Sequence, residues 1–160
     1  MKGCVDNMIV RKAGGRSMAN KSHGNYNCRN TKIKILIPHD NYTLTLIRNT
    51  DFISDLGLIS WGDGRSGNLN TLYMHTYVKA GVYELQGHFV LGLGFEPTKS
   101  MQEVLIEVNQ LSDKCRDLSK AFYNCVNLKK LNLENLDMEK IISTDDMTTG
   151  CCNLTIGGDQ

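Results

Sequence analysis

Side chains that could act as acids, bases or metal ligands are scattered through the middle of the chain, at His39, Asp40, Asp63, His75 and His88. No two of them have the four-residue spacing that would place them on one helical face, and none lies in a known ligand pattern. The motifs G-x-S-x-G and H-E-x-x-H are absent, and Gly92-Leu93-Gly94 stands alone as a glycine pair. We therefore expect no catalytic residue, metal or cofactor. Calcium at the acidic loop Asp51 to Asp55 is an alternative that the sequence leaves open.

The cysteines give no metal or redox motif either. Their spacing matches neither a zinc ribbon nor a CxxC pair. A chain of this length builds its own core and does not need disulfides as staples. We interpret the six as reduced thiols, mostly in the core: Cys4, Cys28, Cys115, Cys125, Cys151 and Cys152.

Alternating apolar residues predict that short strands position these side chains. Ile33, Ile35 and Ile37 alternate with other residues, and Tyr42, Leu44 and Leu46 follow a turn at residues 38–41. Further strands are expected at residues 58–61, 73–77 and 82–91. Short strands separated by turn residues favour an antiparallel sandwich.

Two segments carry a resemblance to PKD-type, immunoglobulin-like domains. Ile59-Ser60-Trp61-Gly62-Asp63-Gly64 is followed, after a loop, by His75-Thr76-Tyr77-Val78-Lys79-Ala80-Gly81-Val82-Tyr83. Trp61, the only tryptophan, is expected to fill the sandwich core, and Asp63 to accept hydrogen bonds within its own turn. Tyr77 and Tyr83 flank a turn in the manner of a tyrosine corner. The resemblance implies a spacing or binding role and no reaction. The signature residues are Trp61, Asp63, Gly64, His75, Tyr77, Gly81 and Tyr83.

The second half repeats with a 26-residue period, because Cys125, Asn127 and Leu128 recur as Cys151, Asn153 and Leu154. With Phe122, this pattern resembles the BspA-type leucine-rich repeats of bacterial and phage surface proteins. The resemblance implies stacked coils with cysteine and leucine in the core and asparagine bonded to backbone.

Details of the repeat lead to three further expectations. Residues 117–123 should form a short helix. Leu128, Leu131 and Leu133 should have counterparts one repeat earlier at Met101, Val104 and Ile106. The sandwich should cap the first coil, and the last copy, with Thr148 where Phe122 stood, should be unfinished.

The N-terminal segment is basic, whereas the rest of the chain is acidic. Residues 1–34 carry eight Lys or Arg against one Asp, while the whole chain has a net charge of +1. Such a segment is either a solubilising tail or an element that docks on a partner. We expect docking through Arg11, Lys12, Arg16 and Lys21.

These patterns together predict a mainly β protein with a basic arm (1–31), a PKD-like sandwich (32–97) and BspA-like repeats (98–160). The expected function is non-enzymatic: a phage virion component, such as a head fibre, decoration or tail-associated protein, that is assembled in the host cytoplasm. The alternative is a fragment of a bacterial cell-surface adhesin. Partners would be other protein subunits in a homo-oligomer, a capsid or tail neighbour, or a host-surface protein or glycan. Nucleic-acid binding through the arm is a weaker alternative, and no apolar run predicts an export signal or a membrane span.

Overall fold

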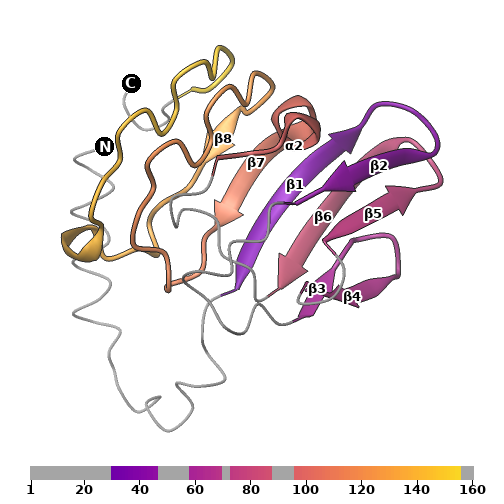
Figure 1. The fold of residues 1–160 in the computed structure, drawn as a ribbon, viewed down its shortest axis with the longest axis horizontal. Helices are drawn as coiled ribbons and strands as arrows, with labels where there is room; N and C mark the ends of the chain where they lie inside the picture. Colours follow the sequence, from indigo (N-terminus) through magenta and orange to yellow (C-terminus); the bar gives the residue numbers. More distant parts are fainter. Residues whose placement is uncertain (1–29, 47–57, 70–72, 88–95, 156–160) are drawn as a thin grey trace, which may run out of the picture.

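The computed structural model describes residues 30–46, 58–69, 73–87 and 96–155, and these form a mainly β protein whose strands pair mostly antiparallel (Figure 1). The elements in chain order are β1 (Thr31–Ile37), β2 (Tyr42–Thr45), β3 (Leu58–Ser60), β4 (Ser66–Asn68), β5 (Met74–Tyr77), β6 (Gly81–Gly87), α2 (Lys99–Val104), β7 (Leu105–Gln110), β8 (Lys130–Leu131) and the 3₁₀ turn η2 (Met138–Lys140). The five predicted strand segments all contain strands, and β4 was not predicted.

Strand β1 organises the molecule because it lies inside a six-stranded sheet of order β4-β3-β6-β1-β7-β8. It pairs antiparallel with β6 on one side and with β7 on the other. Its alternation is that of a half-buried strand: Ile33, Ile35 and Ile37 are buried, while Lys34 and Leu36 point to the opposite face. The two-stranded sheet β2-β5 supplies further core residues, and it is drawn beside β6 and β1 in Figure 1.

The predicted boundary at residues 97 and 98 does not separate two sheets. Strand β7, from the second half, pairs with β1 of the first, and buried residues from both halves form one hydrophobic cluster. Helix α2 adds to the junction, since its N-cap Thr98 donates from its hydroxyl to the carbonyl of Thr45 at 2.7 Å. No helix in the described ranges is long and apolar enough to cross a membrane.

The predicted arm also ends too late in the chain. Thr31 belongs to β1, is completely buried, and accepts a hydrogen bond from the backbone N–H of Ser112 at 3.1 Å. The folded part therefore begins before residue 31, and a deletion that removes Thr31 would cut into the central strand.

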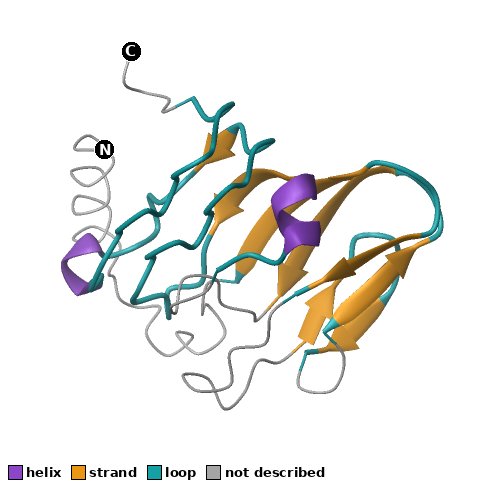
Figure 2. Cartoon of the chain, turned by 45° about the horizontal axis from the view of Figure 1, so that its top comes forward, coloured by secondary structure: helices purple, strands orange, loops and turns teal. Residues whose placement is uncertain are grey.

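Backbone hydrogen bonds in the second half repeat with the predicted 26-residue period. We call residues 117–128 the middle repeat and residues 143–154 the last repeat. Five turn hydrogen bonds of the middle repeat recur at the equivalent positions of the last one. The left-handed residues recur as well: Lys120 and Asp146 both have φ 54°, and Asn124 (56°) corresponds to Gly150 (84°). Figure 2 shows the two repeats as adjacent, mostly loop-like traces.

Two expectations for this half are wrong. Residues 117–123 do not form a helix: Asp117 makes an isolated β-bridge with Ser143 and turns begin at residue 119. The left-handed φ angles of Lys120 and Asn124 are incompatible with a right-handed helix. The predicted counterparts Met101, Val104 and Ile106 are also incorrect: Leu131 lies opposite Val108 in the parallel pair of β7 and β8. The chain changes from helix α2 to strand β7 at Leu105, so the first segment does not keep the 26-residue offset.

Candidate functional site

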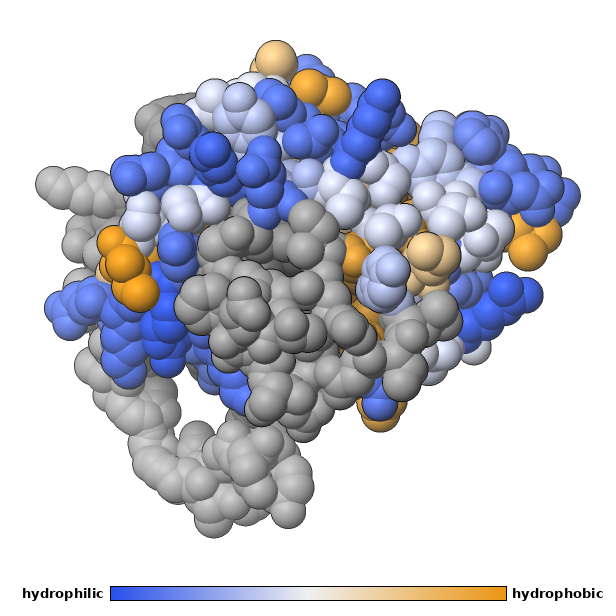
Figure 3. Space-filling model, viewed as in Figure 1, coloured by the Kyte–Doolittle hydropathy of each residue, from blue (hydrophilic) through white to orange (hydrophobic). Residues whose placement is uncertain are grey.

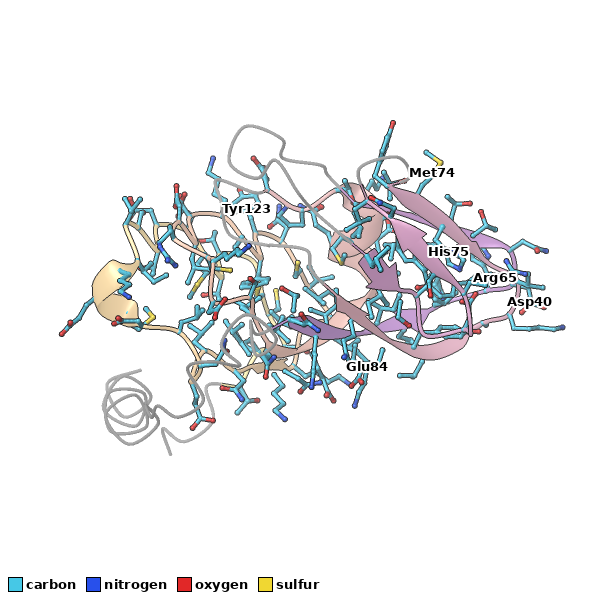
Figure 4. All side chains as sticks on the ribbon, turned by 90° about the horizontal axis from the view of Figure 1, so that it is seen from below. Asp40, Arg65, Met74, His75, Glu84 and Tyr123 are labelled. Carbon is cyan, nitrogen blue, oxygen red and sulfur yellow. The ribbon has the colours of Figure 1, made fainter. Side chains whose placement is uncertain are left out.

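The residues of the predicted sandwich signature gather around Trp61, which follows β3 and is only 1% exposed. The imidazole of His75, on β5, stacks on the indole at 4.8 Å between ring centroids and an interplanar angle of 7°. The hydroxyl of Tyr77, also on β5, donates to the carbonyl of Trp61 at 2.8 Å. Figure 4 shows His75 among the strands of this part of the molecule. The cluster therefore joins two strands of different sheets through one tryptophan.

Asp63 and His75 form an acid–imidazole pair beside the indole, with 2.8 Å between Oδ2 and Nε2. A carboxylate can only accept, so Nε2 carries the proton and donates it. The other carboxylate oxygen accepts from the backbone N–H of Arg65 at 3.1 Å. Burial alone would raise the pKa of Asp63, but the hydrogen bonds from His75 and Arg65 outweigh it and lower that pKa.

The two tyrosines close the cluster. The rings of Tyr77 and Tyr83 lie 4.6 Å apart, and burial raises the pKa of Tyr77 far above its ordinary value. The hydroxyl of Tyr83 donates to the carbonyl of Lys79, four residues upstream, at 2.9 Å, which is the local tie expected of a tyrosine corner. Gly64 (φ 91°) and Gly81 (φ 148°) occupy positions in or next to turns with φ angles that favour glycine.

The remaining candidates for acid–base or metal chemistry do not join this cluster. Asp40 accepts from the backbone N–H of Ala80, which with Lys79 lowers the pKa of its carboxyl, and His39 stacks edge-on against Tyr42. Within the described part of the chain, no three His, Cys, Asp or Glu residues lie close enough to hold a metal ion. His88, the loop 51–55 and the glycine pair at 92–94 lie outside it.

The repeat residues occupy equivalent places with unequal burial. Phe122, Cys125 and Leu128 of the middle repeat are completely buried, whereas Cys151 and Leu154 of the last repeat are only partly buried. Burial raises the pKa of Cys125 to about 12. The expectation that both Cys125 and Cys151 lie in the core therefore holds fully for Cys125 alone. Cys115 is buried and Cys152 is exposed, so the described thiols are not all core residues.

The repeated asparagines tie each repeat to the preceding segment. The side-chain amide of Asn127 donates to the carbonyl of Glu103, and that of Asn153 to the carbonyl of Val126, both at 2.7 Å. Each bond runs from one segment to the backbone of the segment before it. The two asparagines therefore act as equivalent clamps between neighbouring layers.

Sequence reasoning missed a row of alternating charges across the outer face of the sheet. Strand pairing places Lys130 beside Glu107, Glu107 beside Lys34, and Lys34 beside Glu84. Lys34 and Glu107 form an ion pair at 3.0 Å, which lowers the pKa of Glu107. These residues are far apart in sequence, and only the pairing of β8 with β7 and of β7 with β1 brings them together. The described residues that are visible in Figure 3 are largely hydrophilic, with a few apolar residues among them.

The predicted docking residues Arg11, Lys12, Arg16 and Lys21 lie outside the described residues. Comparison of the chain with protein-family models, with characterised proteins and with solved structures gives no match.

Proposed function

We propose that this chain is a non-enzymatic assembly module, in the setting of a virion component, in which a rigid body is held to its neighbours by the basic N-terminal segment. The proposal rests on the hydrogen bonds made by the side chains that could act as acids or bases. Asp63, His75 and Tyr77 are hydrogen-bonded to one another or to the backbone at or beside the core, so their polar groups stabilise the fold.

The finer fold belongs to the same proposal. A PKD-like sandwich is supported by the packing of His75 and Tyr77 on Trp61 and by the tie from Tyr83 to Lys79. A short BspA-like stack is supported by the 26-residue recurrence of turn bonds and by the asparagine clamps. One sheet runs through both parts, which suits a spacer that must keep its shape under load.

Charge distribution supports docking through the N-terminal segment. Six Lys or Arg residues precede residue 30, against the single acid Asp6. The described residues carry more acidic than basic side chains, so the segment and the body attract each other across copies. The basic segment could bind equally well to another copy of the chain or to a capsid neighbour with an acidic face.

The test is the native mass of the full chain and of a variant lacking residues 1–29, measured by sedimentation velocity at low and high salt. We expect oligomers for the full chain at low salt and monomers for the deletion, with unchanged fluorescence of the single tryptophan as the check of folding. A full chain that stays monomeric at high concentration and low salt would contradict assembly and favour the adhesin alternative.

The same two proteins also test the alternative hypothesis that the N-terminal segment binds nucleic acid. Binding through phosphate contacts would weaken steeply as salt is raised. Tight, strongly salt-dependent binding of the full chain to nucleic acid, lost on deletion of residues 1–29, would replace the assembly proposal with a nucleic-acid-binding function.

A further inference from the structure

Among the described residues, the last repeat leaves a row of backbone donors without acceptors at the end of the stack. In the middle repeat, the N–H groups of alternate residues donate to carbonyls of the last repeat at 2.8–3.0 Å: Leu118 to Ser143, Lys120 to Asp145, Phe122 to Met147 and Asn124 to Thr149. The equivalent N–H groups one repeat later belong to Thr144, Asp146, Thr148 and Gly150. Within the described residues these four donate no hydrogen bond. The stack therefore ends in an edge that can accept one more layer.

Side-chain burial shows the same open end. Leu118 is completely buried, and its equivalent Thr144 is exposed. Leu128 is completely buried, and its equivalent Leu154 is only partly buried. The difference follows from coverage, because in the described part of the chain the middle repeat has a layer on both sides and the last repeat on one. A further layer would cover these positions.

The end of the stack is also acidic. Residues 137–155 contain Asp137, Glu139, Asp145 and Asp146, with Lys140 as the only cation. Asp145 and Asp146 are both exposed, next to the unpaired donors. An occupant of this edge should therefore be basic.

We propose that the basic segment of residues 1–29 from a second copy of this chain docks on the open edge of the last repeat, so that copies associate head to tail. This inference rests on the proposed assembly function and names the surface that receives the segment. The segment is long enough for one layer of the 26-residue period, and its net charge is opposite to that of the edge. Its Met8-Ile9-Val10 supplies apolar groups for the half-buried side chains of the last repeat.

The edge of a second copy is a poorer occupant than its basic segment. Two last repeats placed edge to edge would bring Asp145 and Asp146 of both copies together, and like charges at an interface oppose association. A head-to-tail contact instead pairs opposite charges and leaves another edge and segment available at each end of the assembly.

The experiment uses charge reversal in the full chain. The edge variant is Asp145→Lys with Asp146→Lys, and the segment variant is Arg11→Glu with Lys12→Glu. Lysine is compatible with position 146, because its equivalent is Lys120 with the same φ of 54°. The matched control is Glu84→Lys with Glu96→Lys, which makes the same change of charge on exposed residues outside the last repeat. Association is measured by sedimentation velocity at low salt, and folding by thermal melting.

We expect the edge variant and the segment variant each to weaken association about tenfold or more, which is about 1.4 kcal/mol, while the control associates like the unaltered chain. An equimolar mixture of the two defective variants should associate again, because each chain then offers the charge that the other needs. Failure of the mixture to associate overturns docking between copies.

An edge variant that associates like the control overturns the inference. If deletion of residues 1–29 still abolishes association in that case, the assembly function stands and the receiving surface lies elsewhere. If the deletion leaves the mass unchanged, the proposed function itself fails.

Discussion

The middle and last repeats share one backbone geometry and differ in what covers them. Both contain the same turn hydrogen bonds and the same pair of left-handed residues. In the middle repeat Phe122 and Cys125 are completely buried, while their equivalents Thr148 and Cys151 are partly exposed. The backbone of a repeat is therefore set by its own turns, whereas its burial is set by its place in the stack.

This difference explains the weaker sequence pattern of the last repeat. A phenylalanine at position 148 would expose a large apolar side chain at an uncovered end, and threonine does not. Gly150 replaces Asn124 at a position whose φ is left-handed in both repeats. The left-handed turn conformations are therefore retained although their residues change, and the large apolar residues Leu118 and Phe122 are replaced by threonines.

The largest expected effect is a difference in stability between alanine substitutions at equivalent positions of the two repeats. Phe122→Ala should lower the free energy of unfolding by about 3–5 kcal/mol, because it empties a completely buried position. Thr148→Ala, at the equivalent position, should change it by about 0.5 kcal/mol or less. Chemical denaturation measures both. Equal losses for the two variants would mean that position 148 is covered as well as position 122.

A change outside both repeats provides the reference. Asp63→Asn should cost about 1.5–3 kcal/mol at neutral pH, the usual range for a hydrogen bond to a charged group. The folded pKa of Asp63 is depressed, so its contribution is present above the unfolded pKa of 3.8 and is lost as the pH falls through the folded value. Unfolding free energies measured from pH 2 to 7 should therefore converge for the two proteins at the acid end. A constant difference over the whole range would contradict the pair with His75.

The asparagine clamps should be equal in the two repeats. Asn127→Ala and Asn153→Ala each remove one bond of 2.7 Å to the preceding segment, and both side chains are exposed. Each should cost about 0.5–1.5 kcal/mol. Asn→Asp at either position keeps the size and removes the donor, so it should cost at least as much as alanine. A loss at one position only would show that the two clamps are not equivalent.

Thiol labelling should report the difference in burial between the two repeats without any substitution. Cys125 is buried with a pKa of about 12, so it should stay unlabelled at pH 8, whereas exposed Cys152 should react fast and partly buried Cys151 at an intermediate rate. Site-resolved mass spectrometry of a labelling time course gives the three rates. Equal labelling rates at Cys125 and Cys151 would contradict the difference in burial between the two repeats.

Much of the strand arrangement before residue 88 was predictable because its signals are local. The alternation of Ile33, Ile35 and Ile37 predicts a half-buried strand, and the signature segments predict a buried Trp61 and a turn hydrogen bond to Asp63. The stacking of His75 on Trp61 and its bond to Asp63 were not predicted. The pairing of β7 with β1 was not predictable, since it joins residues that are far apart in the chain. Residues 117–123 were predicted to form a helix, because the lysine side chain at position 120 gives no indication of its left-handed φ. The open edge was also missed: a row of unpaired backbone donors depends on neighbours and leaves no pattern in the side chains.

Amide hydrogen exchange of the full chain tests the docking edge most directly. The N–H groups of Leu118, Lys120, Phe122 and Asn124 are bonded within the chain, and the equivalent N–H groups of Thr144, Asp146, Thr148 and Gly150 are not bonded to any described residue. We predict slow exchange for the first four at every protein concentration. The second four should exchange fast in dilute solution and become protected at concentrations where the chain associates. Fast exchange of the second four in the assembled protein would contradict docking at this edge.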